Sequence, residues 1–163
     1  MKKNRFSRII SKINRTPEFC KSWLLTKAFC SQVKFAGTAG IKILEVSNQK
    51  VVIELVNKKK VQNHIGGVHA VAAAVIAESA TGIVFGMNVK DSCLPLLKSM
   101  KMSYVRRMQG AITATATLSE EQAQSIYAHD KGELLIDVQI VDESGQEPIE
   151  CEMTWAWITK DRK

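Results

Sequence analysis

The chain has 163 residues, of which 45% are hydrophobic and 24% charged, and this balance excludes a disordered tail or a collagen-like chain. A chain of this length can bury about 70% of the surface that its unfolded form exposes, so its core needs no metal or disulfide. The four cysteines and three histidines show neither a CxxC pair nor a zinc-ligand spacing. We therefore expect one soluble domain in a reducing compartment, with no metal site.

The net charge of +7 is unevenly distributed along the chain. Residues 1–60 contain 14 basic and 3 acidic side chains, whereas residues 61–163 contain 9 basic and 13 acidic ones. No segment has the apolar run of a secretory signal, and none has the ~18 apolar residues of a membrane span. The sequence therefore predicts a cytoplasmic protein.

Part of the basic excess lies in residues 1–16, where apolar side chains recur at helical spacing among basic ones. This basic N-terminal arm is predicted to be a short amphipathic helix. Two interpretations stay open. The helix packs on the domain, or it contacts a membrane surface or an acyl-chain partner. The apolar residues are Phe6, Ile9, Ile10 and Ile13, and the basic ones include Lys2 and Lys3.

Residues 17–163 are predicted to form a single domain that begins with a helix. Thr16 and Pro17 are typical of a helix start, with Thr16 as the N-cap, and the helix is expected to reach about Val33. Glycines at 37 and 40 are expected to break it. Two strand-like runs, 41–46 and 51–56, then form a hairpin around a polar turn.

The segment from Val61 to Val89 contains a single formally charged side chain, Glu78, and predicts a helix that is apolar on nearly every face. Alternating apolar residues downstream predict antiparallel strands, and Ser119 with Gln122 predicts a capping box that opens a short helix. The economical arrangement is an α+β fold in which one long buried helix is wrapped by a curved antiparallel sheet. The strands are expected near residues 100–104, 111–118, 134–140 and 149–157.

Glu78 is costly in such a helix, because burying a carboxylate costs several kcal/mol unless it is paired, hydrogen-bonded or protonated. One interpretation places it near the helix end, where the chain returns to solvent, or pairs it with a distant arginine. The other places it in a dry cleft, which is the usual setting of a general base.

Gly66 and Gly67 precede the same helix, and they permit close approach of a ligand to the free N–H groups of its first turn. His69 and Glu78 are nine residues apart, which places them ~13 Å apart along a continuous helix. One substrate carbonyl cannot contact both. The spacing therefore predicts an obligate homodimer with composite sites, two per dimer.

Together, Asn63, Gly66-Gly67, His69 and Glu78 resemble, in type and spacing, the signature of hotdog-fold acyl-CoA thioesterases of the PaaI-like branch. The resemblance covers roughly residues 17–160 and implies a hotdog fold, here with an extra N-terminal helix. It implies acyl-CoA (thioester) hydrolysis in a homodimer, or in a tetramer of paired dimers. It assigns Glu78 as general base or nucleophile and Asn63 to orient water or polarise the carbonyl.

The resemblance further implies that the backbone N–H of Ala70 forms the oxyanion site, while His69 shapes the turn before it. The family commonly has glycine where this chain has Ala70. A serine of the partner chain is also expected, and among Ser92, Ser99 and Ser103 we choose Ser99. Arg106 and Arg107, with the lysines at 58–60, suit the phosphates of coenzyme A, which enters as part of the substrate and not as a separate cofactor.

Other functions remain as alternatives. A hotdog fold does not guarantee a reaction, so a non-catalytic acyl-CoA-binding or regulatory module is the main one. A hotdog dehydratase is less favoured, because the resemblance for that branch includes a Pro-Gly helix start that this chain lacks. A nucleic-acid partner is not expected, because the chain has no recognition motif and few aromatic residues.

Overall fold

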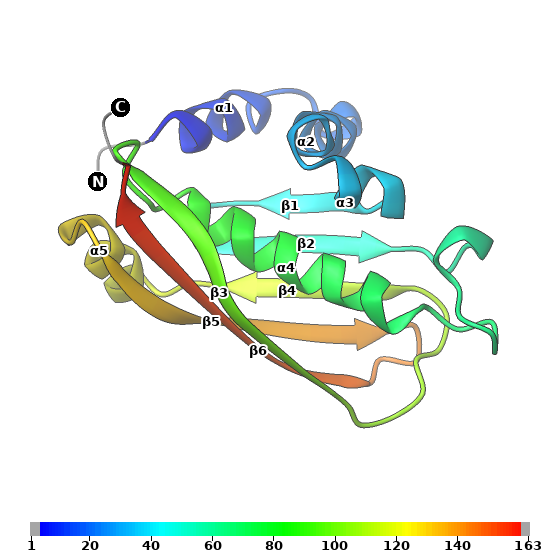
Figure 1. The fold of residues 1–163 in the computed structure, drawn as a ribbon. Coiled ribbons are helices and arrows are strands. Elements are labelled where there is room, and N and C mark those ends of the chain that lie inside the picture. Colours follow the sequence, from blue (N-terminus) through cyan, green and yellow to red (C-terminus); the bar gives the residue numbers. More distant parts are fainter. Residues whose placement is uncertain (1–3, 161–163) are drawn as a thin grey trace.

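Six strands form one antiparallel sheet that curves around a central helix in the computed structural model, which describes residues 4–160 (Figure 1). The strand order is β1-β2-β4-β5-β6-β3, and the predicted α+β hotdog arrangement is confirmed. Lys2 and Lys3 of the predicted arm, and residues 161–163 of the predicted domain, lie outside the described residues. The helices are α1 (Arg5–Ile13), α2 (Glu18–Gln32), α3 (Lys34–Ala39), α4 (Ala70–Gly86) and α5 (Glu120–Ala128), with a short 3-10 turn at Lys59–Val61, and the strands are β1 (Lys42–Val46), β2 (Lys50–Leu55), β3 (Cys93–Tyr104), β4 (Ile112–Thr117), β5 (Gly132–Asp142) and β6 (Ile149–Thr159).

The core lies between α4 and the concave face of the sheet (Figure 1). Alternate residues of β4 point to α4, so that Ile112, Ala114 and Ala116 are fully buried, as the period of two predicts. The small side chains of α4 let the helix lie close to the strands, and Ala73 and Ala77 have no exposed surface. Burial of this apolar surface is the main stabilising term, at about 25 cal/mol per Å².

Helix α2 packs along the edge strand β1 and forms hydrogen bonds to its backbone through two side-chain hydroxyl groups. Ser22 Oγ donates to the carbonyl oxygen of Ile43 at 2.6 Å, and Thr26 Oγ1 accepts from the N–H of Ile43 at 2.9 Å. An edge strand presents unpaired backbone groups that can hydrogen-bond to another chain. Here the two hydroxyls satisfy the N–H and C=O groups of Ile43. Between them Leu25 is fully buried, which fixes this face of α2 toward the sheet.

Helix α1 packs against the C-terminal end of α4. The Asn4 side chain donates to the carbonyl oxygens of Gly86 and Val89 at 2.7 and 2.6 Å, and it accepts from the N–H of Ser7. Ile10, on the inner face of α1, is only 4% exposed. Residues of the predicted arm from Asn4 onward are therefore held on the domain by both polar and apolar contacts.

Two local predictions near the N-terminus are wrong. Thr16 does not cap α2, because its hydroxyl donates to the carbonyl oxygen of Ile13 and so closes α1, while α2 begins without a side-chain cap. The chain also does not leave helical structure at Gly37, which lies inside α3. That helix ends at Gly40, whose φ of 80° suits glycine. The capping box at Ser119 and Gln122 is confirmed.

The contact between Gly82 of α4 and the Trp155 ring of β6 gives a stability prediction. A Cβ at Gly82 would lie 2.8 Å from a Trp155 ring carbon, and the indole is held by a hydrogen bond to Thr81. We expect Gly82→Ala to lower the free energy of unfolding by about 1–2 kcal/mol, because overpacking outweighs the gain in helix propensity. Urea unfolding measures the change.

Gly86→Ala is the matched control in the same helix. A Cβ there meets Phe6 at 3.7 Å, which is ordinary contact, so the substitution should raise the free energy of unfolding by about 0.5–1 kcal/mol. Equal effects of the two substitutions would contradict the close approach of α4 to β6.

Candidate functional site

Glu78 is the ninth of the 17 residues of α4, so it lies in the middle of the helix and not near its end. It shares one helix face with Val71 and Val75, because residues four and three apart lie above one another. Its side chain borders a cavity of about 400 Å³ between α3 and α4. The lining is otherwise mostly apolar, and comprises Val33, Phe35, Ala36, Val71, Ala74, Val75, Ser79 and Met100.

Burial in this apolar cavity raises the pKa of Glu78 above its ordinary value, and the neighbouring Ser79 hydroxyl opposes part of the rise. The cause is desolvation, which disfavours the charged carboxylate. No salt bridge to Glu78 is present among the described residues, which leaves the carboxylate without a compensating cation. A carboxylate of this kind is a stronger base than one in water.

A second cavity, of about 340 Å³, continues along the same helix face toward the N-terminus of α4. It shares Phe35, Val71 and Val75 with the Glu78 cavity, so we treat the two as one α3–α4 groove. His69 lines the far end of this groove, with Lys60 and Gln62 beside it. His69 and Glu78 therefore lie at opposite ends, separated by nine residues of helix rise, or ~13 Å.

Asn63 organises the turn that leads into α4. Its Oδ1 accepts from the N–H groups of Ile65 and Gly67, both at 3.1 Å, and its backbone N–H donates to the carbonyl oxygen of Gly67. Gly66 between them has a φ of 78°, a conformation that suits glycine. The Asn63 side chain is thus occupied by its own turn, as in other Asx turns.

His69 is the N-cap of α4, and its Nδ1 accepts from the N–H of Val71 at 3.1 Å. The N–H of Ala70, the first helical residue, has no acceptor among the residues that the structure describes. Unpaired N–H groups at the start of a helix attract negative charge. Tyr104 of β3 donates its hydroxyl to the carbonyl oxygen of Ala70 at 2.8 Å, which ties this end of α4 to the edge strand.

The two predicted arginines have different surroundings. Arg106 Nη1 lies 3.1 Å from a carboxylate oxygen of the buried Asp142 and 3.2 Å from the Ser144 hydroxyl. Although burial opposes it, hydrogen bonds from Ser144 and Gln109 and the charge of Arg106 hold the pKa of Asp142 below its ordinary value. The Arg106 guanidinium is therefore engaged in the fold.

Arg107 is exposed and lies beside the predicted glycine turn. Its Nη2 donates to the carbonyl oxygen of Ile65 at 2.9 Å. Ser99 is exposed on β3, next to an irregularity in the pairing with β6, and it lines neither cavity of the α3–α4 groove. The fold thus brings Arg107, Asn63 and the glycines together, and it leaves Ser99 apart from them within one chain.

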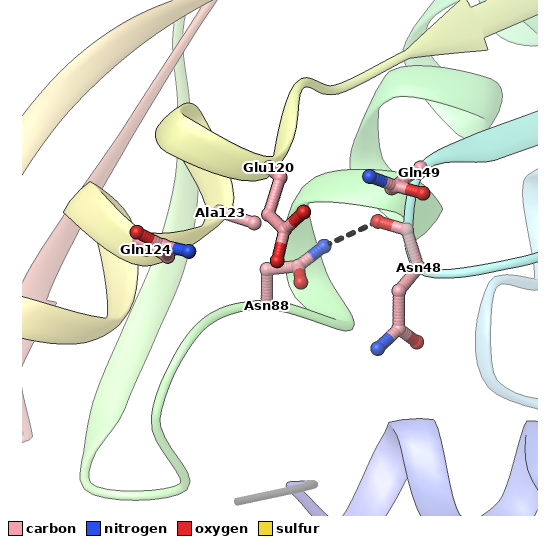
Figure 2. A pocket seen from close by; sticks show the side chains of 6 residues that line it. All are labelled: Asn48, Gln49, Asn88, Glu120, Ala123 and Gln124. Atoms are coloured by element: carbon pink, nitrogen blue, oxygen red, sulfur yellow. Dashed lines mark hydrogen bonds between the residues drawn. The ribbon is translucent and has the colours of Figure 1, made fainter. Parts of the chain in front are cut away.

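A third cavity, of about 360 Å³, lies at the opposite end of α4 and contains none of the predicted site residues (Figure 2). Its lining residues are of polar type apart from Ala123, with Glu120 and Gln124 of α5 facing Asn88 and the turn before β2. Asn88 Nδ2 donates to the carbonyl oxygens of Asn48 and Val84, both at 2.8 Å (Figure 2). The bond to Asn48 anchors the end of α4 to the turn between β1 and β2, and the bond to Val84 closes the last turn of the helix, so Asn88 has a structural role.

The apolar side chains that α3 and α4 contribute to the groove are not predicted as site residues, whereas a methionine at 100 suits the border of an acyl tunnel by its flexibility and does line the cavity. Val71 and Val75 carry a usable signal, because they precede Glu78 at helical spacing. Phe35 carries no such signal, because it lies between the predicted end of a helix near Val33 and the predicted break at glycines 37 and 40. In the described part of the chain, no three His, Cys, Asp or Glu residues are grouped to hold a metal ion, and no helix has the length and apolarity needed to cross a bilayer.

A family model for a domain of unknown function, DUF4442, matches residues 21–158 of the chain. The chain belongs to the DUF4442 family. No curated protein matches this DUF4442 sequence. Solved structures share its fold at low sequence identity.

Three such structures show how far the likeness extends. A Pseudomonas aeruginosa protein of unknown function, described as a probable thioesterase, has a TM-score of 0.76 and 21% identity, covering 84% of this chain and 95% of its own. A thioesterase from Haemophilus influenzae has a TM-score of 0.68 and 15% identity, covering 85% and 90%. A mutant of a Staphylococcus aureus thioesterase has a TM-score of 0.65 and 20% identity, covering 77% and 98%. At these low sequence identities, the structural similarity establishes the hotdog fold alone.

The raised pKa of Glu78 predicts a pH-dependent stability. Glu78 has a higher pKa in the folded protein than in the unfolded chain, so its contribution to stability is present at low pH and is lost as pH rises through the folded-state pKa. Glu78→Gln cannot ionise. We expect the variant to be more stable than the wild type near pH 8, with the difference vanishing towards pH 4.

Urea unfolding at a series of pH values measures this difference. Glu120→Gln, which replaces an exposed glutamate, is the matched control for loss of a surface carboxylate. A Glu78→Gln variant that is no more stable than the wild type at any pH would show that the carboxylate is solvated.

Proposed function

We propose that the protein is a thioester hydrolase in which Glu78 activates water. The observation that carries this proposal is the isolated Glu78 carboxylate in an apolar groove, with a pKa raised by burial. A carboxylate of raised pKa accepts a proton from water more readily than a solvated carboxylate. The fold shared with proteins described as thioesterases supports the same reaction class.

The reaction passes through a tetrahedral oxyanion. Glu78 takes a proton from water while the water oxygen attacks the thioester carbon, and the carbonyl oxygen becomes an oxyanion. The N–H of Ala70, which has no acceptor among the described residues, stabilises that oxyanion together with the positive end of α4. The C–S bond then breaks. The proton on Glu78 passes to the thiolate, which releases a carboxylic acid and a free thiol.

The two ends of the groove act on one carbonyl only if they come from two chains. His69 and Ala70 lie ~13 Å from Glu78 along α4, whereas reacting groups must approach to ~3 Å. We therefore assign the oxyanion site to one protomer and the base to Glu78 of the partner subunit. A two-fold axis then generates two identical sites per dimer.

The edge strand β3 supports a dimer of this kind. Within the described residues it pairs on one side with β6, and its other side is open. Exposed apolar side chains on β3 include Leu94, Leu96 and Met100, each at least 40% exposed, and Val71 of α4 is 56% exposed. Apolar surface on an unpaired edge favours pairing with a second copy.

For the substrate, we propose an acyl thioester of coenzyme A, with the acyl chain along the apolar α3–α4 groove. Phe35 is 63% exposed at the rim, where it can cover an inserted chain. Arg107 and the lysines at 58–60 supply positive charge near the glycine turn, where the coenzyme phosphates would lie. Arg106 is already paired with Asp142 and is the weaker candidate for this role.

A non-catalytic acyl-thioester-binding module is the second candidate function. It is favoured by the Asn63 side chain, which is hydrogen-bonded within its own turn and so is not directed at a water molecule. In this alternative the groove binds the acyl thioester without hydrolysis. Tight binding without turnover distinguishes it from the hydrolase.

Glu78→Gln tests the hydrolase. Thioester cleavage, followed with a thiol reagent over a panel of acyl-CoA chain lengths, should fall at least ~100-fold, because the amide cannot accept the proton from water. Glu120→Gln should retain wild-type turnover. Wild-type turnover in a folded Glu78→Gln variant would remove Glu78 from the mechanism.

Leu96→Glu tests the composite site. A carboxylate on the exposed edge of β3 should oppose pairing of two copies, so the mass in solution should fall from that of a dimer to that of a monomer. Hydrolysis should fall at least ~10-fold with it, since each site then lacks its second chain. Light scattering after gel filtration gives the mass.

Leu135→Glu is the control for Leu96→Glu. Leu135 is 47% exposed on β5, which pairs on both sides within the sheet, so its substitution should leave both mass and activity unchanged. A fully active Leu96→Glu monomer would contradict the assignment of two chains to one site.

A further inference from the structure

The outer face of α2 carries exposed aromatic side chains. Phe19 is 90% exposed and Trp23, one helical turn later, is 62% exposed. The adjoining face, which includes the buried Leu25, holds the two hydroxyls that fix α2 on β1. The orientation of α2 is therefore set by its inner face, and it leaves two large aromatic rings in solvent. Exposed aromatic pairs of this size mark contact surfaces.

Positive charge lies beside Trp23 and elsewhere on the same segment of the chain. Lys27 Nζ lies 5.7 Å from the centre of the Trp23 ring, at the distance of a cation–π contact. Between Asn4 and Lys42 the only acidic residue is Glu18, and it is paired with Lys21. Lys12, Arg15, Lys27 and Lys34 form no ion pair with any residue that the structure describes.

Helix α1 extends this surface. Ile9 on its outer side is 52% exposed, while Ile10 faces the domain. Figure 1 shows α1 and α2 together along the β1 edge of the sheet, so both helices present their outer faces on the same end of the molecule. A cavity of about 430 Å³ beside Trp23 and Lys27 adds a recess to that surface.

We propose that the outer faces of α1 and α2 bind an anionic lipid bilayer surface. Aromatic rings are favoured at the boundary between headgroups and acyl chains, and each nearby lysine or arginine adds attraction to anionic lipids. A second copy of the chain is a poorer occupant. A two-fold contact would place the unpaired cations of one protomer against those of the other.

Tryptophan fluorescence is a selective probe of this surface. Trp155 and Trp157 are 6% and 4% exposed, so a change on binding reports mainly on Trp23. With vesicles of equimolar phosphatidylglycerol and phosphatidylcholine, we expect the emission of the full chain to shift to shorter wavelength and the protein to sediment with the vesicles. Pure phosphatidylcholine vesicles, or high salt, should give neither effect.

Two variants and two matched controls distinguish binding through this surface from nonspecific electrostatic or hydrophobic adsorption to the vesicles. Phe19→Ser and Lys27→Glu should each lower partitioning to the anionic vesicles at least ~5-fold. Leu135→Ser and Lys131→Glu change an exposed apolar and an exposed basic residue outside α1 and α2, and should leave partitioning unchanged. Retention of the wild-type urea midpoint shows that each variant is folded.

Three results would overturn the proposal. The first is unchanged Trp23 emission in anionic vesicles, and the second is equal partitioning of Phe19→Ser and the wild type. The third is shielding of Trp23 from acrylamide before any vesicle is added, which would place the surface between copies of the chain. None of these depends on thioester hydrolysis.

Discussion

Close packing of α4 on β6 determines which side chains reach the α3–α4 groove. Gly82 lets the Trp155 ring lie against the helix backbone, and the Trp155 N–H donates to Thr81 Oγ1 at 2.9 Å. These contacts fix the rotation of α4 about its axis. Gly82 lies one turn after Glu78 on the stripe that also holds Val71 and Val75, so β6 covers this stripe at Gly82, while the part that precedes it borders the cavity beside α3.

That arrangement has a cost in stability. An ionised Glu78 in an apolar cavity loses hydration that no cation replaces within the described residues, and this loss raises its pKa. A glutamine or leucine at this position would suit the fold better. In the proposed hydrolase, the readiness of Glu78 to accept a proton would offset this cost to folding.

Most of the fold could be predicted from the sequence, because its signals are periodic. Alternation over residues 111–118 and 149–157 predicts strands that pack one face on a core, and the uncharged segment around Glu78 predicts the central helix. The groove could not be predicted in full. Its outer wall depends on α3. Glycines at 37 and 40 predict a break in helical structure, but Gly37 lies inside α3 and only Gly40, its C-cap, ends the helix. Pairs such as Arg106 with Asp142 join residues 36 positions apart, and no local pattern reveals them.

The positive charge of the chain divides between two surfaces with different chemistry. Arg107 and the lysines at 58–60 lie near the turn that opens α4, and Lys60 lines the groove. The cations of α1 and α2 lie on two helices that also carry exposed apolar side chains, and Lys27 contacts the Trp23 ring. The cavity beside Trp23 and Lys27 does not contain Glu78. A polyanionic small molecule suits the first surface because its phosphates need a few convergent donors. An extended anionic surface suits the second, because its charges are spread over two helices and its apolar groups stand outward.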